Sequence, residues 1–371
     1  MSKNFSLFLD FIRAAAAFTV LGAHLANPRL QGDWISWAYP FGDEAVMSFF
    51  VLSGLIITYV SQQRENTLQS FTVARLARLW SIVLLALIFT FFADSLGRWL
   101  EPGLYSPDWY YDNVPLLRLL ASALFVNEIW FKQVIPLSNG PFWSLSYEFW
   151  YYVIFAALYF FTGLKRIIFS GIAMLIAGPK IMLLWPVWLM GLAVWYIIQG
   201  QLVRRGFALA IGASALILFV WVELNDMEYF CYHLYSKPLL TEWQPILEWR
   251  MSARFVSDWI YGALFAMIFL GAHALLSLLP RPHFIFSNVI RYVASGTLFI
   301  YLFHFPLINL LHAIGINIGL EADGSLQAWI AIVALIFLLS FGPMLEKTKF
   351  LWYCWINRLY EGGKEFFYRR L

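Results

Sequence analysis

The stretch FSLFLDFIRAAAAFTVLGAHLA at residues 5–26 decides the fold class of this chain. A helix of this length spans about 30 Å, which matches the hydrocarbon core of a bilayer. Asp10 and Arg13 lie inside the run, whereas the central region of a signal peptide is apolar throughout. We therefore interpret residues 5–26 as the first membrane span.

Further apolar runs of spanning or near-spanning length follow along the rest of the chain. Charged residues make up only 13% of the 371 residues, where about 25% is usual for a soluble domain. So little charge cannot cover a water-facing surface, and the spacing of the runs predicts an all-α integral membrane protein. The runs lie at 45–60, 79–96, 142–162, 181–198, 206–223, 256–279, 292–314 and 326–345.

The distribution of Lys and Arg predicts a tenth span and the orientation of the chain. Lys165 and Arg166 precede the short run 167–178, and Arg204 and Arg205 follow the next span. Both pairs are expected in the cytoplasm, so two crossings must lie between them. The predicted cytoplasmic side then holds 16 of the 25 Lys and Arg residues but 4 of the 22 Asp and Glu residues, with both termini cytoplasmic.

The predicted domain organisation is one bundle of about ten transmembrane helices with short loops. The run 114–126 contains a proline and an arginine, and we interpret it as interfacial or re-entrant. Residues 1–345 form the membrane domain, and residues 346–371 form a short basic and aromatic cytoplasmic tail.

Several classes of protein and site are not supported by the sequence. The net charge is only +3, without a basic stretch interleaved with aromatics, so a nucleic-acid partner is not expected. Cys231 and Cys354 form no CxxC pair, which argues against a disulfide scaffold. The histidines show no HExxH spacing, and we expect no metal.

The first span carries three ionisable residues that are costly at membrane depth and are therefore functional candidates. Arg13 and His24 are eleven residues apart, which places them within about 20° of one helix face and about 16 Å apart along the axis. Asp10 lies one turn before Arg13, within salt-bridge reach. This face predicts a lined passage, and the alternative is a structural Asp10–Arg13 pair with an interfacial histidine.

Other unusual residues lie in three later segments. Glu148 in WSLSYEFWYY (143–152) enters the membrane about 9 Å below the start of its span, unless it only bonds a neighbouring helix. Arg75 and Arg78 in FTVARLARLW (71–80) are spaced to bind a phosphate, although topology signalling or lipid contact also explains them. His304 follows Tyr301 by one turn in YLFHFP (301–306), where a satisfied core histidine is the alternative.

These segments together resemble acyltransferase family 3, a family of integral membrane proteins. The resemblance rests on Arg13 and His24 in one span, followed in order by FFVLSG (49–54), RLAR (75–78), WSLSYE (143–148) and SGTLFIYLFHFP (295–306). It implies a ten-span core that transfers an acyl group, commonly acetyl, from cytosolic acyl-coenzyme A to a sugar hydroxyl. The acceptor is often the O-antigen of lipopolysaccharide or another surface glycan, and the expected location is the cell inner membrane.

One position departs from the family pattern. Members often carry an aspartate two positions before the FFVLSG run, where this chain has Met47. Asp43 and Glu44, just upstream, can supply the missing acid. Only about 25 residues follow the last predicted span, so an added extracytoplasmic domain is not matched and a stand-alone transferase is expected.

The resemblance assigns a provisional role to each candidate. His24 is the general base, because imidazole titrates near neutrality, and Glu148 or Glu44 orients it. Arg13 holds the acyl donor or steadies the developing negative charge. Arg75 and Arg78 bind the phosphates of acyl-coenzyme A. The other expected residues are Tyr301 and His304 on the donor, and Trp34, Asp43, Trp143 and Ser146 on the acceptor.

Two alternatives remain open on the sequence. An acyl-serine intermediate on Ser144 or Ser146 is a second route, although no GxSxG elbow surrounds these residues. A transporter or flippase is the rival function, because ionisable residues inside a ten-span bundle also describe a substrate or proton pathway. Inverted-repeat transporters show matching broken helices in their two halves, and this chain has no such internal symmetry.

Overall fold

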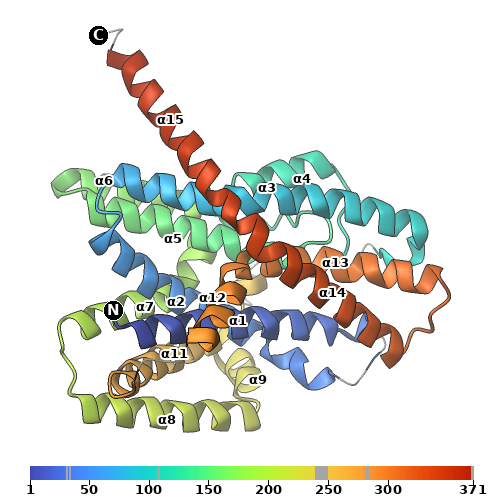
Figure 1. The fold of residues 1–371 in the computed structure, drawn as a ribbon, viewed down its shortest axis with the longest axis horizontal. Coiled ribbons are helices and arrows are strands. Elements are labelled where there is room, and N and C mark those ends of the chain that lie inside the picture. Colours follow the sequence, from blue (N-terminus) through green and yellow to red (C-terminus); the bar gives the residue numbers. More distant parts are fainter. Residues whose placement is uncertain (31, 33–34, 107–108, 239–249, 281–283, 369–371) are drawn as a thin grey trace.

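A computed structural model describes residues 1–30, 32, 35–106, 109–238, 250–280 and 284–368 of the chain. The described residues form helices and no β-strand, as predicted for an all-α membrane protein (Figure 1). The helices are α1 (Lys3–Leu25), α2 (Gly42–Gln63), α3 (Leu68–Leu100), α4 (Pro115–Ala123), α5 (Trp143–Phe160), α6 (Gly163–Ala177), α7 (Pro179–Gln199), α8 (Arg205–Leu224), α9 (Met227–Cys231), α11 (Phe255–Leu276), α12 (Phe284–Ser295), α13 (Thr297–Asn317), α14 (Gly324–Leu345) and α15 (Lys349–Tyr368).

Eight helical segments in the described part of the chain are long and apolar enough to cross a membrane. They comprise α1, α2, α3, α7, α8, α11, α13 and the α14–α15 segment. The predicted spans 142–162 and 167–178 correspond to α5 and α6, which have 18 and 15 residues. A 15-residue helix is about 22 Å long, so α6 can cross only where the bilayer thins. The prediction of about ten spans therefore depends on these two short helices.

Three segments differ in detail from the sequence-based expectation. The predicted span 292–314 is broken at Gly296 into α12 and α13, and only glycine fits there, because a Cβ atom would lie 2.8 Å from Pro343 of α14. The run 114–126 contains the nine-residue helix α4, which is too short to span. The expected tail 346–371 is largely helix α15, which projects from the bundle with the C-terminus at its far end (Figure 1).

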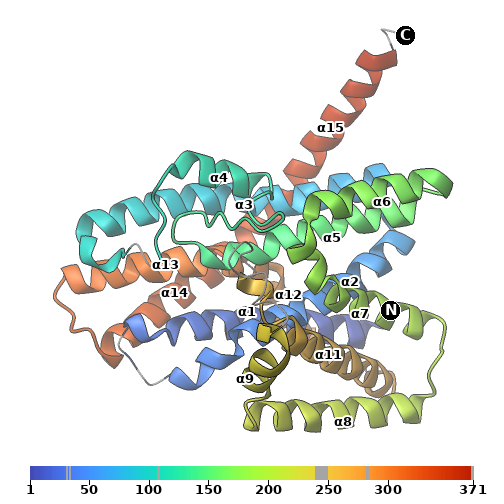
Figure 2. The same cartoon turned by 180° about the vertical axis from the view of Figure 1, so that it is seen from behind.

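Helices α2 and α13 form the centre of the bundle. In the most apolar 18-residue stretch of each of these two helices, 78% of the residues are buried, whereas in that of α8 only 22% are. Helix α8 lies at the margin opposite α3 and α4 in both views (Figure 2). The candidate motifs FFVLSG and YLFHFP therefore belong to the two most enclosed helices, where buried polar groups need protein partners.

Two glycines let α2 and α7 pack backbone to backbone. A Cβ atom added at Gly54 would lie 2.0 Å from the carbonyl oxygen of Trp188, and one at Gly191 would lie 1.8 Å from that of Val51. Only glycine allows such an approach, which is typical of helix contacts in membranes. The glycine that ends FFVLSG thus fixes the distance between these helices.

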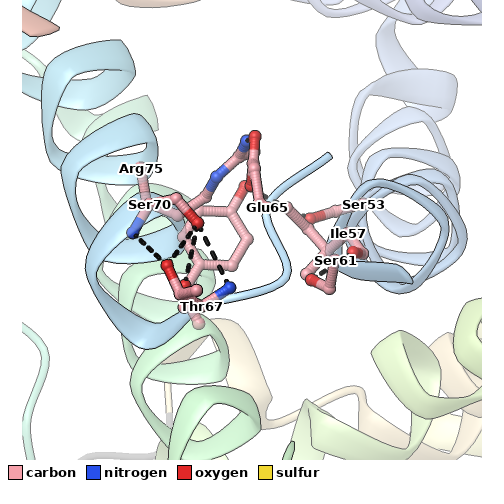
Figure 3. Close-up of polar contacts among 8 residues, drawn as sticks. Ser53, Ile57, Ser61, Glu65, Thr67, Ser70 and Arg75 are labelled. Atoms are coloured by element: carbon pink, nitrogen blue, oxygen red, sulfur yellow. Dashed lines mark hydrogen bonds and ion pairs between the residues drawn. The ribbon is translucent and has the colours of Figure 1, made fainter. Parts of the chain in front are cut away.

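The turn between α2 and α3 is held by polar contacts (Figure 3). Thr67 caps α3. Its hydroxyl accepts a hydrogen bond from the Ser70 backbone N–H at 3.1 Å, and the Ser70 hydroxyl accepts one from the Thr67 backbone N–H at 3.2 Å. Glu65, just after α2, pairs with Arg75 of α3 at 2.5 Å. The turn therefore fixes the cytoplasmic foot predicted for α3.

Candidate functional site

A cavity of about 60 Å³ lies at the centre of the bundle, enclosed by α1, α2, α3, α5 and α13. We call it the central cavity. Its walls are mostly apolar but contain Arg13, Arg78 and Glu148, three of the ionisable residues singled out in the sequence. The structure thus brings together side chains from three helices that are distant along the chain.

Glu148 is held by hydroxyl groups on one side of the central cavity. Its Oε1 accepts a hydrogen bond from the Ser53 hydroxyl at 2.9 Å and a second from the Tyr152 hydroxyl. The Trp188 indole donates to the Ser53 oxygen at 3.2 Å and so fixes the serine. Ser53 precedes Gly54, so the close packing of α2 and α7 also positions this carboxylate.

The arginines of this region have different partners. Arg13 Nη1 lies 3.8 Å from Asp10 Oδ1, as the three-residue spacing predicts, and its side chain lines the central cavity. Arg78 also lines the cavity. Arg75 is instead buried against Glu65 and is not part of the cavity wall. The predicted two-arginine phosphate grip is therefore not formed in this arrangement, and Arg78 is the arginine of the pair that is available.

Two clefts open at the other end of α1, the end predicted to be extracytoplasmic. The first cleft, of about 470 Å³, is lined by residues that include His24, Asp43 and Trp143. The second cleft, of about 510 Å³, lies on the other side of His24. Val46 and Tyr301 line both the first cleft and the central cavity, so the two compartments adjoin at these side chains, which we call the partition.

His24 is oriented by a backbone carbonyl and a second histidine. Its Nδ1 lies 2.9 Å from the Val20 carbonyl oxygen and 3.4 Å from Nε2 of His304. His304 is fully buried, and its own Nδ1 lies 3.1 Å from the Ile300 carbonyl oxygen. Carbonyl oxygens only accept, so both Nδ1 atoms carry hydrogen, and Nε2 of His24 retains its lone pair.

The carboxylates that were expected to orient His24 lie elsewhere. Glu148 faces the central cavity, and Glu44 is buried near Arg254 at the start of α11. Within the described ranges neither carboxylate is hydrogen-bonded to His24. The expectation fails because Glu148 lies on the cavity side of the Val46–Tyr301 partition, and His304 occupies the orienting position instead.

Tyr301 is fixed at the partition rather than free to hold a donor. Its hydroxyl donates to the Pro141 carbonyl oxygen at 3.0 Å and lies 2.7 Å from the Ser144 hydroxyl. Ser144 lines the central cavity. Ser146 is fully buried, donates to Asn127 and lines none of the three cavities, so the structure does not bring it together with the other acceptor candidates.

The remaining acceptor candidates have mixed outcomes. Asp43 and Trp143 line the first cleft together with His24. Trp34 lies outside the described residues. Another tryptophan, Trp109, lines the second cleft.

The sequence reasoning missed the arginine that organises the first cleft. Arg254 contacts Asp43 at 3.1 Å, Asp258 at 3.7 Å, and also Glu228. Burial opposes its charge, but these carboxylates outweigh burial and raise the pKa of Arg254 above its ordinary value. The i, i+4 spacing of Arg254 and Asp258 at the start of a predicted span was the available signal.

Comparison with known proteins identifies the family of this chain. Within the described ranges, no group of three or more His, Cys, Asp or Glu residues is placed to hold a metal ion. No curated protein and no solved structure matches the chain. A family model described as an acyltransferase domain matches residues 6–345, nearly the whole length. The chain therefore belongs to acyltransferase family 3, and it is a multi-pass membrane protein of this acyltransferase family.

Proposed function

We propose that this protein is a membrane O-acyltransferase that moves an acyl group, typically acetyl, from cytosolic acyl-coenzyme A to a sugar hydroxyl of a surface glycan such as the O-antigen. The membrane is the inner membrane of the cell. The observation that carries the proposal is the placement of His24 in the clefts, with the arginine-lined central cavity on the far side of Val46 and Tyr301. A donor and an acceptor can thus approach one partition from opposite sides.

The central cavity suits the donor arm of acyl-coenzyme A. It offers about 60 Å³ of space, and its walls are largely apolar. We expect the nucleotide to remain at the cytoplasmic mouth, where Arg78 attracts phosphate charge, while the thioester arm extends past Arg13. Arg13 then binds carbonyl oxygens of the arm, since it lies about three helical turns from His24.

His24 is the general base in this proposal. With hydrogen on Nδ1, its Nε2 accepts the proton of the sugar hydroxyl as that oxygen attacks the thioester carbonyl. The tetrahedral intermediate collapses with loss of the thiolate of coenzyme A, which takes up a proton. The new oxygen–carbon bond leaves the acyl group on the sugar. Asp43 and Trp143 in the first cleft are the proposed contacts for the acceptor.

The test uses the purified full chain in nanodiscs with radiolabelled acetyl-coenzyme A and candidate glycans. We expect His24→Ala to lower transfer about 10²- to 10⁴-fold, the usual contribution of a general base. His233→Ala is the matched control, because His233 also bonds the carbonyl four residues before it, at 3.0 Å, yet it is exposed and lines neither cleft.

Two results would contradict the proposal. Label transfer that survives His24→Ala removes this residue from the base role. Movement of a solute across the membrane of a proteoliposome, without any label transfer by the wild type, favours the transporter instead.

A further inference from the structure

The second cleft borders His24 but plays no part in the proposed chemistry. Its volume of about 510 Å³ falls in the range of small-ligand sites. It is formed by the end of α1, the segment after it, the segment after α3, and α13. Among its described wall residues are Arg29, Trp109, Asn309 and His312, and none is a carboxylate.

Arg29 in this cleft has an unusual environment. Its guanidinium lies 4.0 Å from the centre of the Trp109 ring and 5.7 Å from that of Phe305. Its Nε donates to the Asn27 side chain at 3.3 Å. In the described part of the chain no carboxylate pairs with it, and the terminal nitrogens have no hydrogen-bond partner. The four N–H groups on its two terminal nitrogens therefore remain available to a ligand.

The environment of Arg29 differs from that of Arg254 in the first cleft. Arg254 is surrounded by three carboxylates, which raise its pKa, whereas burial lowers the pKa of Arg29. Arg29 also lies on the predicted extracytoplasmic side of the membrane, so the preference for Lys and Arg in cytoplasmic loops does not explain its presence. A partly buried arginine without a counter-ion is costly unless an anion is bound beside it.

Two further polar groups line the same wall from α13. Asn309 is 8% exposed, and its Nδ2 has no hydrogen-bond partner among the described residues. His312 is 7% exposed and follows Asn309 by one helical turn. The Asn309 Nδ2 atom is enclosed within the wall, so Arg29 and His312 are the side chains placed to donate into the cleft, and none of the described wall residues is an acid.

We propose that the second cleft is an anion subsite, which binds a carboxylate or phosphate group on a sugar unit next to the one acylated at His24. The inference rests on the proposed function, since it makes the acceptor an acidic oligosaccharide that lies across His24. The acylated unit occupies the first cleft, and its acidic neighbour pairs with Arg29 in the second. Trp109 supplies an apolar surface for the ring of that neighbour.

Binding to the purified full chain in nanodiscs, measured by titration calorimetry without any acyl donor, tests the subsite. The ligands are trigalacturonate, a phosphorylated trisaccharide and neutral trigalactose. We expect the preferred acidic ligand to bind at least about tenfold more tightly than the neutral one, and Arg29→Gln to remove that preference. The two acidic arms show whether carboxylate or phosphate is favoured.

Arg98→Gln is the matched control, because it removes an arginine on the same predicted side that pairs with Asp112 and lines neither cleft. Equal affinity of the wild type for all three ligands, or the same loss for acidic and neutral ligands in Arg29→Gln, would overturn the inference. Failure of the proposed function is a separate outcome: acidic ligands then still bind through Arg29, but no ligand is acylated.

Discussion

Replacing Gly54 by alanine tests whether close helix packing builds the central cavity. The new methyl group would lie 2.0 Å from the Trp188 carbonyl oxygen and 3.1 Å from the Leu192 nitrogen. Ordinary contact begins at 3.4 Å, and both neighbours are backbone atoms that no rotamer change can move. Helices α2 and α7 must therefore separate, which disturbs the Trp188–Ser53 hydrogen bond across this contact and the position of Ser53 beside Glu148.

The expected cost follows from two opposing effects. Overpacking of a well-packed interior typically destabilises by about 1–3 kcal/mol, and a clash with backbone belongs at the upper end. Alanine is better than glycine inside a helix by about 1 kcal/mol, which offsets part of the cost. We expect Gly54→Ala to lower the free energy of unfolding by about 2 kcal/mol. We also expect the rate of acyl transfer to fall, because the Ser53–Glu148 hydrogen bond is disturbed.

Reversible unfolding in mixed micelles measures this effect, with Gly171→Ala as the control. Gly171 lies within α6, and a Cβ atom there would meet nothing within 4 Å, so its replacement should be neutral or stabilising. Gly191→Ala should act like Gly54→Ala, and the double variant should cost less than the sum because one separation relieves both clashes. Wild-type stability in Gly54→Ala would refute the packing argument.

Two further perturbations probe buried charge and the donor side. Lys180→Met should destabilise by about 3–5 kcal/mol, since it removes one partner of a buried ion pair in which Lys180 and Glu128 lie 2.5 Å apart. Stability should recover in Lys180→Met/Glu128→Gln, and no recovery would contradict this account. Arg78→Gln should raise KM for acetyl-coenzyme A about tenfold and leave the melting temperature unchanged. Arg75→Gln should lower the melting temperature, because it removes the ion-pair partner of Glu65, and should leave KM near the wild-type value. The reverse pattern in KM would assign phosphate binding to Arg75.

Features set by short-range spacing could be predicted from the sequence. The Asp10–Arg13 contact follows from the helical repeat, and the central cavity does contain Arg13. The all-α membrane fold follows from composition and the length of the apolar runs. These predictions succeed because they depend on a single helix and on the thickness of a bilayer.

Features that depend on packing between distant helices could not be predicted. His304 lies 280 residues from His24, and nothing in either segment marks them as neighbours. Glu148 lines the central cavity, whereas His24 lines the clefts beyond Val46 and Tyr301, and the spacing within WSLSYEFWYY does not indicate this separation. Likewise, the spacing in RLAR does not distinguish Arg75 from Arg78, whereas the ion pair between Arg75 and Glu65 does.

The partition has a consequence for the membrane as an insulator. A transferase with a water-filled bore would leak protons and ions and would dissipate the gradients on which the cell depends. Val46 and Tyr301 lie where the two compartments adjoin. A membrane that stays impermeable to ions is therefore compatible with catalysis, provided that only the small acyl unit passes these two side chains. The selectivity of such an enzyme against bulky acyl chains would then be a by-product of keeping the bilayer sealed.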